Sequence, residues 1–384
     1  FYEYDELNRV KQRTDPIQKP GGGPCITFFV YDTPLPVPTA ECSDCTGPTK
    51  GSSLVSKQID GNGKVTYFAY DDLDRQRMVL RKQGDTDFVH DPNDAATLTT
   101  YDEDDNVLSV TEPNGNTTRY EYDALSRRRA MVNAALDVTQ FTYDPVGNVK
   151  TVTAPNGNVT TNTYDGMKRV IEVQDSAGSV GRYTYDPVGN RRTMTDGNGN
   201  TTGYNYDPVY RVIAITDPLN ASKFFEYDPG GNLLRETDRN GNQTTHLYDA
   251  INRRTTTRDA IGAFTNYGYD GEGNLTAVQD AKGQTTQYRY DGMNRRTTEI
   301  YPDPAPNTRT FAYDCVGNVI KRTDQKGQLT QYIYNDLYFL MRRAYPFSPS
   351  DHFTYDLSGR MPVSYTHLRA HETKANLVCR LLLE

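Results

Sequence analysis

A Tyr-Asp pair recurs along this chain with a step of 21 residues. The step holds without a slip from Tyr101-Asp102 to Tyr290-Asp291, stretches once to 23 residues, and then returns to 21 for Tyr334-Asn335 and Tyr355-Asp356. A period of this length indicates one supersecondary unit that is copied along the chain. Because each unit in such an array contacts mainly its neighbours, the repeat predicts a long built surface and not a compact core around a catalytic pocket.

Each unit contains two turn signals that are separated by short extended runs. In the unit 227–249, the first signal is Asp-Pro-Gly-Gly-Asn at 228–232 and the second is Asp-Arg-Asn-Gly-Asn at 238–242. Asn-Gly between extended runs is typical of a two-residue hairpin turn, whose central residues both need positive φ. The connections are too short for parallel crossovers, and no stretch of the array has helical periodicity. The sequence therefore predicts an all-β fold of antiparallel β-hairpin repeats.

Aromatic residues also stand two positions before most of the repeat tyrosines. Residues two apart on a strand share a face, so we expect their rings to form a ladder across neighbouring strands. Such cross-strand pairs contribute roughly 0.2–1 kcal/mol each. Asn162 and His246 interrupt the series, and we expect weaker spots there. The aromatic residues of the series are Tyr120, Phe141, Tyr183, Tyr204, Phe225, Tyr267, Tyr288, Phe311, Tyr332 and Phe353.

A second-order repeat of about 42 residues lies over the first. The fifth residue after the repeat Tyr alternates between Asn and Arg, so the full unit is a pair of hairpins. We expect the arginines to lie near the carboxylates of adjacent turns. A further series of aspartates stands ahead of the other turns, where Asx-turns with backbone amides are the favoured interpretation and ligand binding is the alternative. The two series are Asn106, Arg127, Asn148, Arg169, Asn190, Arg211, Asn232, Arg253, Asn274, Arg295 and Asn318, and Asp175, Asp196, Asp217, Asp238, Asp259 and Asp280.

The composition excludes several classes of protein. The net charge is −8, the mean hydropathy is −0.76, and no basic run indicates nucleic-acid binding. No stretch approaches the ~18 apolar residues of a membrane span. Low hydrophobicity would favour disorder, but a disordered chain has no reason to keep tyrosines, turns and β-formers in register.

The repeat pattern divides the chain into four segments. Residues 1–14 are a partial repeat, residues 15–60 are a Pro/Gly-rich insert or a degenerate repeat, and residues 61–360 form the regular array. Residues 363–373 read like a translated sequencing adapter, so we interpret 361–384 as a non-native tail and leave it out of the fold prediction. Because the chain starts with Phe1 inside a repeat, we expect it to be a fragment.

The cysteines and histidines give weak signals. Cys42-x-x-Cys45 has the spacing of half a zinc site or a redox pair, but no His lies near it, and a loop disulfide or idle thiols are favoured. Cys315 takes a turn position that is Pro in sister repeats, and we interpret it as incidental. The zinc-like spacing of His367, His371 and Glu372 falls in the excluded tail, as does Cys379.

One turn has the spacing of a metal loop. Asp-Gly-Asn-Gly-Asn at 196–200 starts like a calcium loop, but the expected Glu is absent and a hairpin turn is favoured. No Ser-His-Asp or Cys-His set stands out. We predict no catalytic, cofactor-binding or metal-binding residue, no cofactor and no enzymatic activity.

The repeat motifs carry a family resemblance. Tyr-Asp-x-x-Gly-Asn at 143–148 and 185–190, with its alternate form Tyr-Asp-x-x-Asn-Arg at 248–253 and 290–295, resembles the YD repeat of Rhs proteins. The resemblance covers roughly residues 61–360. It implies a β-sheet ribbon that spirals into a hollow shell, which in Rhs polymorphic toxins and insecticidal toxin complexes encloses a C-terminal toxin. Related repeats occur in bacterial wall-associated proteins and in teneurins.

Two parts of the family pattern are missing from this sequence. These are the C-terminal core motif that precedes self-cleavage and the toxin domain, so no catalytic residue can be carried over. The resemblance implies a shell segment of a secreted or cell-surface bacterial protein, whose partner is its own C-terminal toxin or effector. A cell-surface adhesion or carbohydrate-binding protein, with glycans or secretion components as partners, is the alternative, and an extracellular spacer is the third possibility.

Overall fold

The computed structural model describes residues 1–19, 23–31, 53–84, 92–302 and 307–361. Within these ranges the chain contains no helix, and 31 strands form one sheet. The prediction of an all-β fold of hairpin repeats is confirmed. The strands are β1 (Tyr2–Tyr4), β2 (Val10–Gln18), β3 (Pro24–Tyr31), β4 (Val55–Ile59), β5 (Val65–Tyr70), β6 (Gln76–Arg81), β7 (Ala95–Tyr101), β8 (Val107–Thr111), β9 (Thr117–Tyr122), β10 (Arg128–Val132), β11 (Val138–Tyr143), β12 (Val149–Thr153), β13 (Val159–Tyr164), β14 (Val170–Asp175), β15 (Gly178–Tyr185), β16 (Arg191–Asp196), β17 (Thr201–Tyr206), β18 (Val212–Thr216), β19 (Ser222–Tyr227), β20 (Leu233–Thr237), β21 (Gln243–Tyr248), β22 (Arg254–Arg258), β23 (Phe264–Tyr269), β24 (Leu275–Gln279), β25 (Thr285–Tyr290), β26 (Arg296–Tyr301), β27 (Asn307–Tyr313), β28 (Val319–Thr323), β29 (Leu329–Tyr334), β30 (Leu340–Ala344) and β31 (Asp351–His352).

The sheet is a ribbon in which each strand between β1 and β31 pairs antiparallel with the strand before it and the strand after it. The pairing of β9 with β10 is representative: Tyr120 lies opposite Met131, and the register shifts by one residue before Tyr122 pairs with Arg128. The same shift precedes the repeat Tyr at the other regular Tyr-Asp turns, such as those after β11 and β13. These β-bulges increase the local twist at one edge of the ribbon, and a long twisted ribbon coils instead of lying flat.

The turns differ in one respect from the two-residue turn that Asn-Gly predicts. In the turn after β8, the amide of Gly115 donates to the carbonyl of Glu112 and the amide of Glu112 donates to the carbonyl of Asn116. Gly115 has a φ of 83°, while Asn114 is not among the residues with positive φ. Each such turn is therefore a type I turn closed by one left-handed residue, a hairpin connection one residue longer than the predicted turn.

The aromatic series does not form the predicted ring-to-ring ladder. Strands with the aromatic pair alternate with strands that lack it, so like rings are two strand spacings apart, or ~9.5 Å. Arginines fill the gap: the guanidinium of Arg128 on β10 lies 4.4 Å from the ring centre of Tyr120 on β9, and Arg254 and Arg296 stack in the same way. Phe339 and Tyr355, near the end of the ribbon, do form a ring–ring contact, with 5.3 Å between the ring centres. The expectation that the sheet is weaker at Asn162 and His246 stays a prediction.

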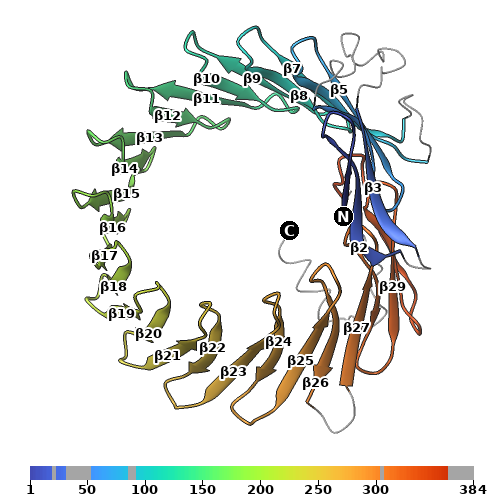
Figure 1. The fold of residues 1–384 in the computed structure, drawn as a ribbon. Coiled ribbons are helices and arrows are strands. Elements are labelled where there is room, and N and C mark those ends of the chain that lie inside the picture. Colours follow the sequence, from blue (N-terminus) through green and yellow to red (C-terminus); the bar gives the residue numbers. More distant parts are fainter. Residues whose placement is uncertain (20–22, 32–52, 85–91, 303–306, 362–384) are drawn as a thin grey trace, which may run out of the picture.

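The ribbon coils into a ring whose two ends overlap (Figure 1). The blue strands β2 and β3 lie beside the orange and red strands β27 and β29, so the sheet passes itself without closing. The apolar core is concentrated near this overlap, in a cluster on β5, β6 and β7 that includes Met78 and Leu80. Strands of the green and yellow part of the ring bury few side chains completely.

The segment at 15–60 contributes strands to the same ribbon. β2, β3 and β4 pair in sequence, and the hydroxyl of Tyr31 donates to the carbonyl of Val10. The division of the chain into four segments stays a prediction, and the tail beyond residue 361 lies outside the described residues. In the part of the chain that the structure describes, no helix has the length and apolar character needed to cross a membrane.

Candidate functional site: the seam between coils

Two kinds of turn line the two edges of the ribbon. We call the edge with turns such as 123–127 and 314–318 the Tyr-Asp edge, and the edge with turns such as 60–64, 112–116 and 196–200 the Asn-Gly edge. In both kinds, the first Asp accepts hydrogen bonds on Oδ1 from the amides two and four residues later, as Asp144 and Asp238 do. The predicted Asx-turn role of the Asp series is confirmed for Asp196, Asp217, Asp238, Asp259 and Asp280, and Asp175 accepts one such bond.

The alternating Asn and Arg residues bind the carboxylate of their own turn. Arg127 pairs with Oδ2 of Asp123 at 2.6 Å, and Asn148 donates to Oδ2 of Asp144 at 2.7 Å. The hydrogen bond from the Arg127 side chain lowers the pKa of Asp123 to about 2, because its effect on the pKa is larger than the opposing effect of desolvation. The expectation that the arginines pair with adjacent turns is wrong for most of the series, because a side chain four residues away reaches its own Asp first. Arg75, which also pairs with Asp105, is an exception.

The arginines nevertheless connect one hairpin to the next. The guanidinium of Arg211 lies 4.8 Å from the ring centre of Tyr227, and its Nη1 donates to the carbonyl of Asp228 at 2.7 Å. Arg75, Arg169, Arg253 and Arg295 make the same pair of contacts. Each of these arginines thus holds its own turn to the next turn of the Tyr-Asp edge, which carries Asn in place of Arg.

The repeat tyrosines use their hydroxyl groups inside the ribbon. Tyr143 donates to the carbonyl of Arg128 and Tyr185 to that of Val170, each 15 residues earlier. These carbonyls lie at the Tyr-Asp edge, where the hydrogen bonds between the strands of the hairpin end. The tyrosine hydroxyl therefore donates to a carbonyl that would otherwise need a hydrogen bond from water. The repeat tyrosines are half-buried, so their rings do not form an exposed row.

The ribbon meets itself along a seam that a disulfide crosses. Cys25 on β3 is bonded to Cys315 in the turn after β27, 290 residues away. The interpretation of Cys315 as incidental is therefore wrong. Gly61 makes the close approach possible, because a Cβ there would lie 2.7 Å from the Cβ of Cys315. Cys42 and Cys45 lie outside the described residues.

Polar side chains surround the disulfide and bridge the two coils. Asn62 donates to Oδ2 of Asp314 at 3.0 Å and accepts from the amide of Cys315 at 3.1 Å. Tyr338 donates to Asp60, and Lys64 forms an ion pair with Asp336. The Asn-Gly edge of the first coil is thus bound to the Tyr-Asp edge of the second.

The surroundings at the seam shift the pKa of two of these groups. Desolvation, followed by the hydrogen bond to Asp60, raises the pKa of Tyr338 far above its ordinary value. Desolvation opposes ionisation of Asp336, but the Lys64 side chain and the amide of Gly84 outweigh it, so the pKa of Asp336 is lowered. Both shifts favour the hydrogen-bonded form in which Tyr338 is neutral and Asp336 is charged.

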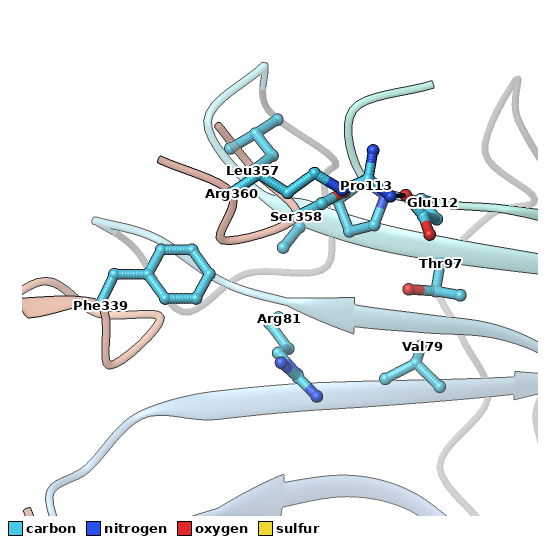
Figure 2. A pocket seen from close by; sticks show the side chains of 10 residues that line it. Val79, Arg81, Thr97, Glu112, Pro113, Phe339, Leu357, Ser358 and Arg360 are labelled. Carbon is cyan, nitrogen blue, oxygen red and sulfur yellow. Dashed lines mark hydrogen bonds and ion pairs between the residues drawn. The ribbon is translucent and has the colours of Figure 1, made fainter. Parts of the chain in front are cut away.

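A second contact lies one 42-residue unit further along the seam. Asn114 donates to Oδ2 of Asp356 at 3.1 Å, and Arg360 pairs with Glu112. These turns line one side of a cavity of about 260 Å³ next to β6 and β7. Phe339 lines another side of the same cavity. Figure 2 shows Arg360 beside Glu112 and the ring of Phe339 facing the strands that carry Val79 and Arg81.

The contacts across the seam fix the length of one coil. Asn62 and Asp314 are 252 residues apart, and so are Gly84 and Asp336, which also touch across the seam. These 252 residues include insertions in the regular repeat, so one coil is shorter than six regular 42-residue units, and a turn of the Asn-Gly edge meets a turn of the Tyr-Asp edge. The contact Asn114–Asp356 spans 242 residues, since ten extra residues separate Asn62 from Asn114 beyond one 42-residue step.

The calcium-like turn uses its carboxylate for its own hydrogen bonds. Within residues 1–19, 23–31, 53–84, 92–302 and 307–361, no three His, Cys, Asp or Glu side chains gather as a metal site would require. Both carboxylate oxygens of Asp196 in the calcium-like turn accept hydrogen bonds from the turn itself. His367, His371 and Glu372 lie beyond the described residues.

The residues of the seam were not predicted from the sequence. Asn62, Asn114, Asp336 and Tyr338 look like ordinary members of their repeat series. A weak signal was Cys315 at a position that sister repeats fill with Pro, together with Cys25 in an early strand.

Comparison with known proteins identifies the repeat and the fold. The family model described as RHS Repeat matches residues 101–136, 143–180, 185–221, 227–263 and 269–305. A search of curated proteins gave no match.

Solved structures of Tc toxin proteins share the fold of the chain. A TcdB2–TccC3 complex with Cdc42 aligns with a TM-score of 0.73 at 14% identity over 94% of this chain. The Photorhabdus luminescens Tc holotoxin pore aligns with a TM-score of 0.71 at 14% identity over 94% of this chain. The chain spans 21% of the length of each of these proteins. With five RHS repeats and this shared coiled ribbon, the chain belongs to the RHS-repeat family.

Proposed function

We propose that the chain is a non-catalytic shell segment of a secreted bacterial Rhs-type protein, which encloses a C-terminal toxin or effector. The observation that carries this proposal is the seam. The second coil of the ribbon is bound edge to edge to the first by a disulfide and by contacts between turns. Coils that are joined in this way form a continuous wall. A spacer or a simple adhesive surface would not need its coils to be joined.

Two further observations support the proposal. The disulfide between Cys25 and Cys315 is typical of proteins in oxidising compartments, which fits secretion or the cell surface. Turn carboxylates such as Asp144 and Asp165 are bound to two backbone amides and one side chain, and such groups serve structure instead of acid–base chemistry.

The test is protease protection of the proposed cargo. The source gene is read onward from the codon for Arg360, the full protein is expressed, and the accessibility of its C-terminal domain to a protease is measured under native conditions. Protection that is lost when seam variants open the coil supports enclosure. Cleavage of that domain at the same rate in intact and opened protein, or a wall anchor in its place, contradicts it.

A further inference from the structure

A lysine and an aspartate form a fully buried pair between β6 and β7. Lys82 directly follows β6, and Asp94 directly precedes β7. Nζ of Lys82 lies 2.6 Å from Oδ2 of Asp94, and both side chains are 0% exposed. Leu80 and Ala96, which lie opposite each other two positions further into the two strands, belong to the apolar cluster. The pair is thus placed beside the apolar core and away from water.

Burial distinguishes this pair from two other lysine–carboxylate pairs of the ribbon. Lys64 with Asp336, and Lys223 with Glu236, keep between 32% and 37% of each side chain exposed. Removing both charges of a pair from water has a large desolvation cost. Transfer of one proton within the buried pair removes this cost, because it leaves a neutral amine beside a neutral carboxylic acid. A lysine amine that is neutral in an apolar site is a nucleophile.

The second oxygen of Asp94 is held by a backbone donor. The amide of Gln83 donates to Oδ1 of Asp94 at 2.7 Å. When a nucleophile adds to Cγ, negative charge develops on this oxygen, and an N–H group that already points at it stabilises that charge. Asp94 therefore has a nucleophile at one oxygen and a charge-stabilising donor at the other, which is the arrangement that attack on a carboxyl carbon requires.

We propose that Lys82 and Asp94 are a modification site at which the chain forms an isopeptide bond with itself. Nζ of Lys82 attacks Cγ of Asp94, so a bond forms between Nζ and Cγ and the bond between Cγ and Oδ2 breaks. Oδ2 takes two protons from Nζ, one before the attack and one after it, and leaves as water. Oδ1 remains as the amide oxygen, and the third proton stays on the amide nitrogen. The reaction is a condensation, so it needs no oxidant and no other reactant.

Two features of the site favour condensation. The reacting groups are already held in contact, so little translational and rotational entropy is lost in the reaction. Burial keeps bulk water from the site, and water is the reactant of the reverse reaction. The bond joins β6 to β7 next to Gly84, whose amide donates to Asp336 across the seam. It forms whether or not the ribbon encloses a cargo, so it does not depend on the proposed function.

The test is mass spectrometry of the full, folded chain after its disulfide has been reduced. We expect a mass that is lower than the mass of the sequence by one water molecule. Trypsin cleaves after a free lysine, and its next site after Lys82 is Arg119. The bond should therefore leave residues 82–119 as one peptide that is lighter by one water molecule. Further digestion before Asp85 with endoproteinase Asp-N should leave two peptides that are still joined, which separates the cross-link from loss of water within one peptide.

Two controls accompany this measurement. Lys82→Arg keeps the positive charge, but its guanidinium forms no such amide, and we expect its mass to equal that of its own sequence. Lys64 and Asp336 provide a control within the chain, since the same two groups form an ion pair there that water reaches. We expect trypsin to cleave after Lys64 as in an unmodified chain.

Either of two results would overturn the proposal. Release of an unmodified peptide 83–119 from the folded chain would mean that the buried pair remains ionic. A loss of water that persists in Lys82→Arg would place the modification elsewhere in the chain. Circular dichroism before digestion establishes that each protein is folded.

Discussion

Asn62 donates a hydrogen bond to Asp314 at 3.0 Å although the two residues are 252 positions apart in the sequence. The contact lies next to the disulfide, because Asn62 also accepts from the amide of Cys315. Cys25 is fully buried and Cys315 is 4% exposed, so a reducing agent can reach the disulfide only when the seam opens. The rate of reduction therefore measures seam opening.

We predict that Asn62→Ala accelerates reduction of the disulfide by dithiothreitol. A net contribution of ~1.5–3 kcal/mol for a hydrogen bond to a charged group corresponds to a ~10- to 100-fold faster reduction when opening limits the rate. The rate is measured by thiol labelling after a quench. Asn198→Ala is the matched control, since Asn198 has the same turn position but is exposed. Equal rates in both variants would show that Asn62 does not hold the seam.

Replacing both Cys25 and Cys315 with Ser is expected to loosen the overlap of the two coils. A crosslink over 290 residues restricts the unfolded chain strongly, by up to ~5–6 kcal/mol in the loop-entropy model. We expect a lower Tm than that of the unchanged protein under oxidising conditions, measured by circular dichroism. In excess dithiothreitol the two proteins should melt together. A difference that persists under reducing conditions would trace the effect to lost packing and not to the crosslink.

Gly61→Ala is expected to disturb the seam while leaving the turn itself intact. Its Cβ would lie 2.7 Å from the Cβ of Cys315, and overpacking of this kind typically costs ~1–3 kcal/mol. The expected result is slower formation of the disulfide during oxidative refolding. Gly271→Ala is the control, because Gly271 also takes the second position of a turn and a Cβ there meets no atom within 4 Å. Unchanged disulfide formation in Gly61→Ala would contradict the close approach.

Arg211→Lys is expected to weaken the link between two hairpins. Lysine keeps the charge but loses the planar group that stacks on Tyr227 and donates to Asp207 and to the carbonyl of Asp228. The stack alone contributes ~0.5–1 kcal/mol. Hydrogen exchange of the amides in β18 and β19 should increase locally. Arg192→Lys, at an exposed position on β16, should leave exchange unchanged, and a global loss of protection in Arg211→Lys would contradict a local role.

Acid should destabilise the repeat turns within a defined range of pH. The hydrogen bond from Arg127 lowers the pKa of Asp123 from 3.8 to about 2, and the pKa of Asp165, Asp249 and Asp356 is lowered too. A carboxylate with a lowered pKa stabilises the fold above its unfolded value, and the contribution is lost as the pH falls through the folded value. We expect the Tm to be steady above about pH 4 and to fall steeply toward pH 2. A Tm that is unchanged at the lower pH would refute the role of these carboxylates.

The hairpin repeat follows from the sequence alone, because each part of it is encoded locally. Glycine or asparagine supplies the left-handed position in most of the turns, aspartate binds the amides two and four residues on, and alternating β-formers fix the strand faces. Such signals act over fewer than 21 residues, so a single repeat is enough to read them. The alternation of Asn and Arg was also visible, although its function was not.

The place where the ribbon meets itself could not be predicted from the repeats. The curvature of a coil is the sum of small twists at many bulges, and no single repeat reveals that Asn62 lies against Asp314 or Cys25 against Cys315. The partners of the arginines could not be predicted either, since the four-residue reach of Arg127 to Asp123 depends on the turn geometry. Contacts within a repeat follow from the local sequence, whereas contacts between coils follow from accumulated geometry over 252 residues.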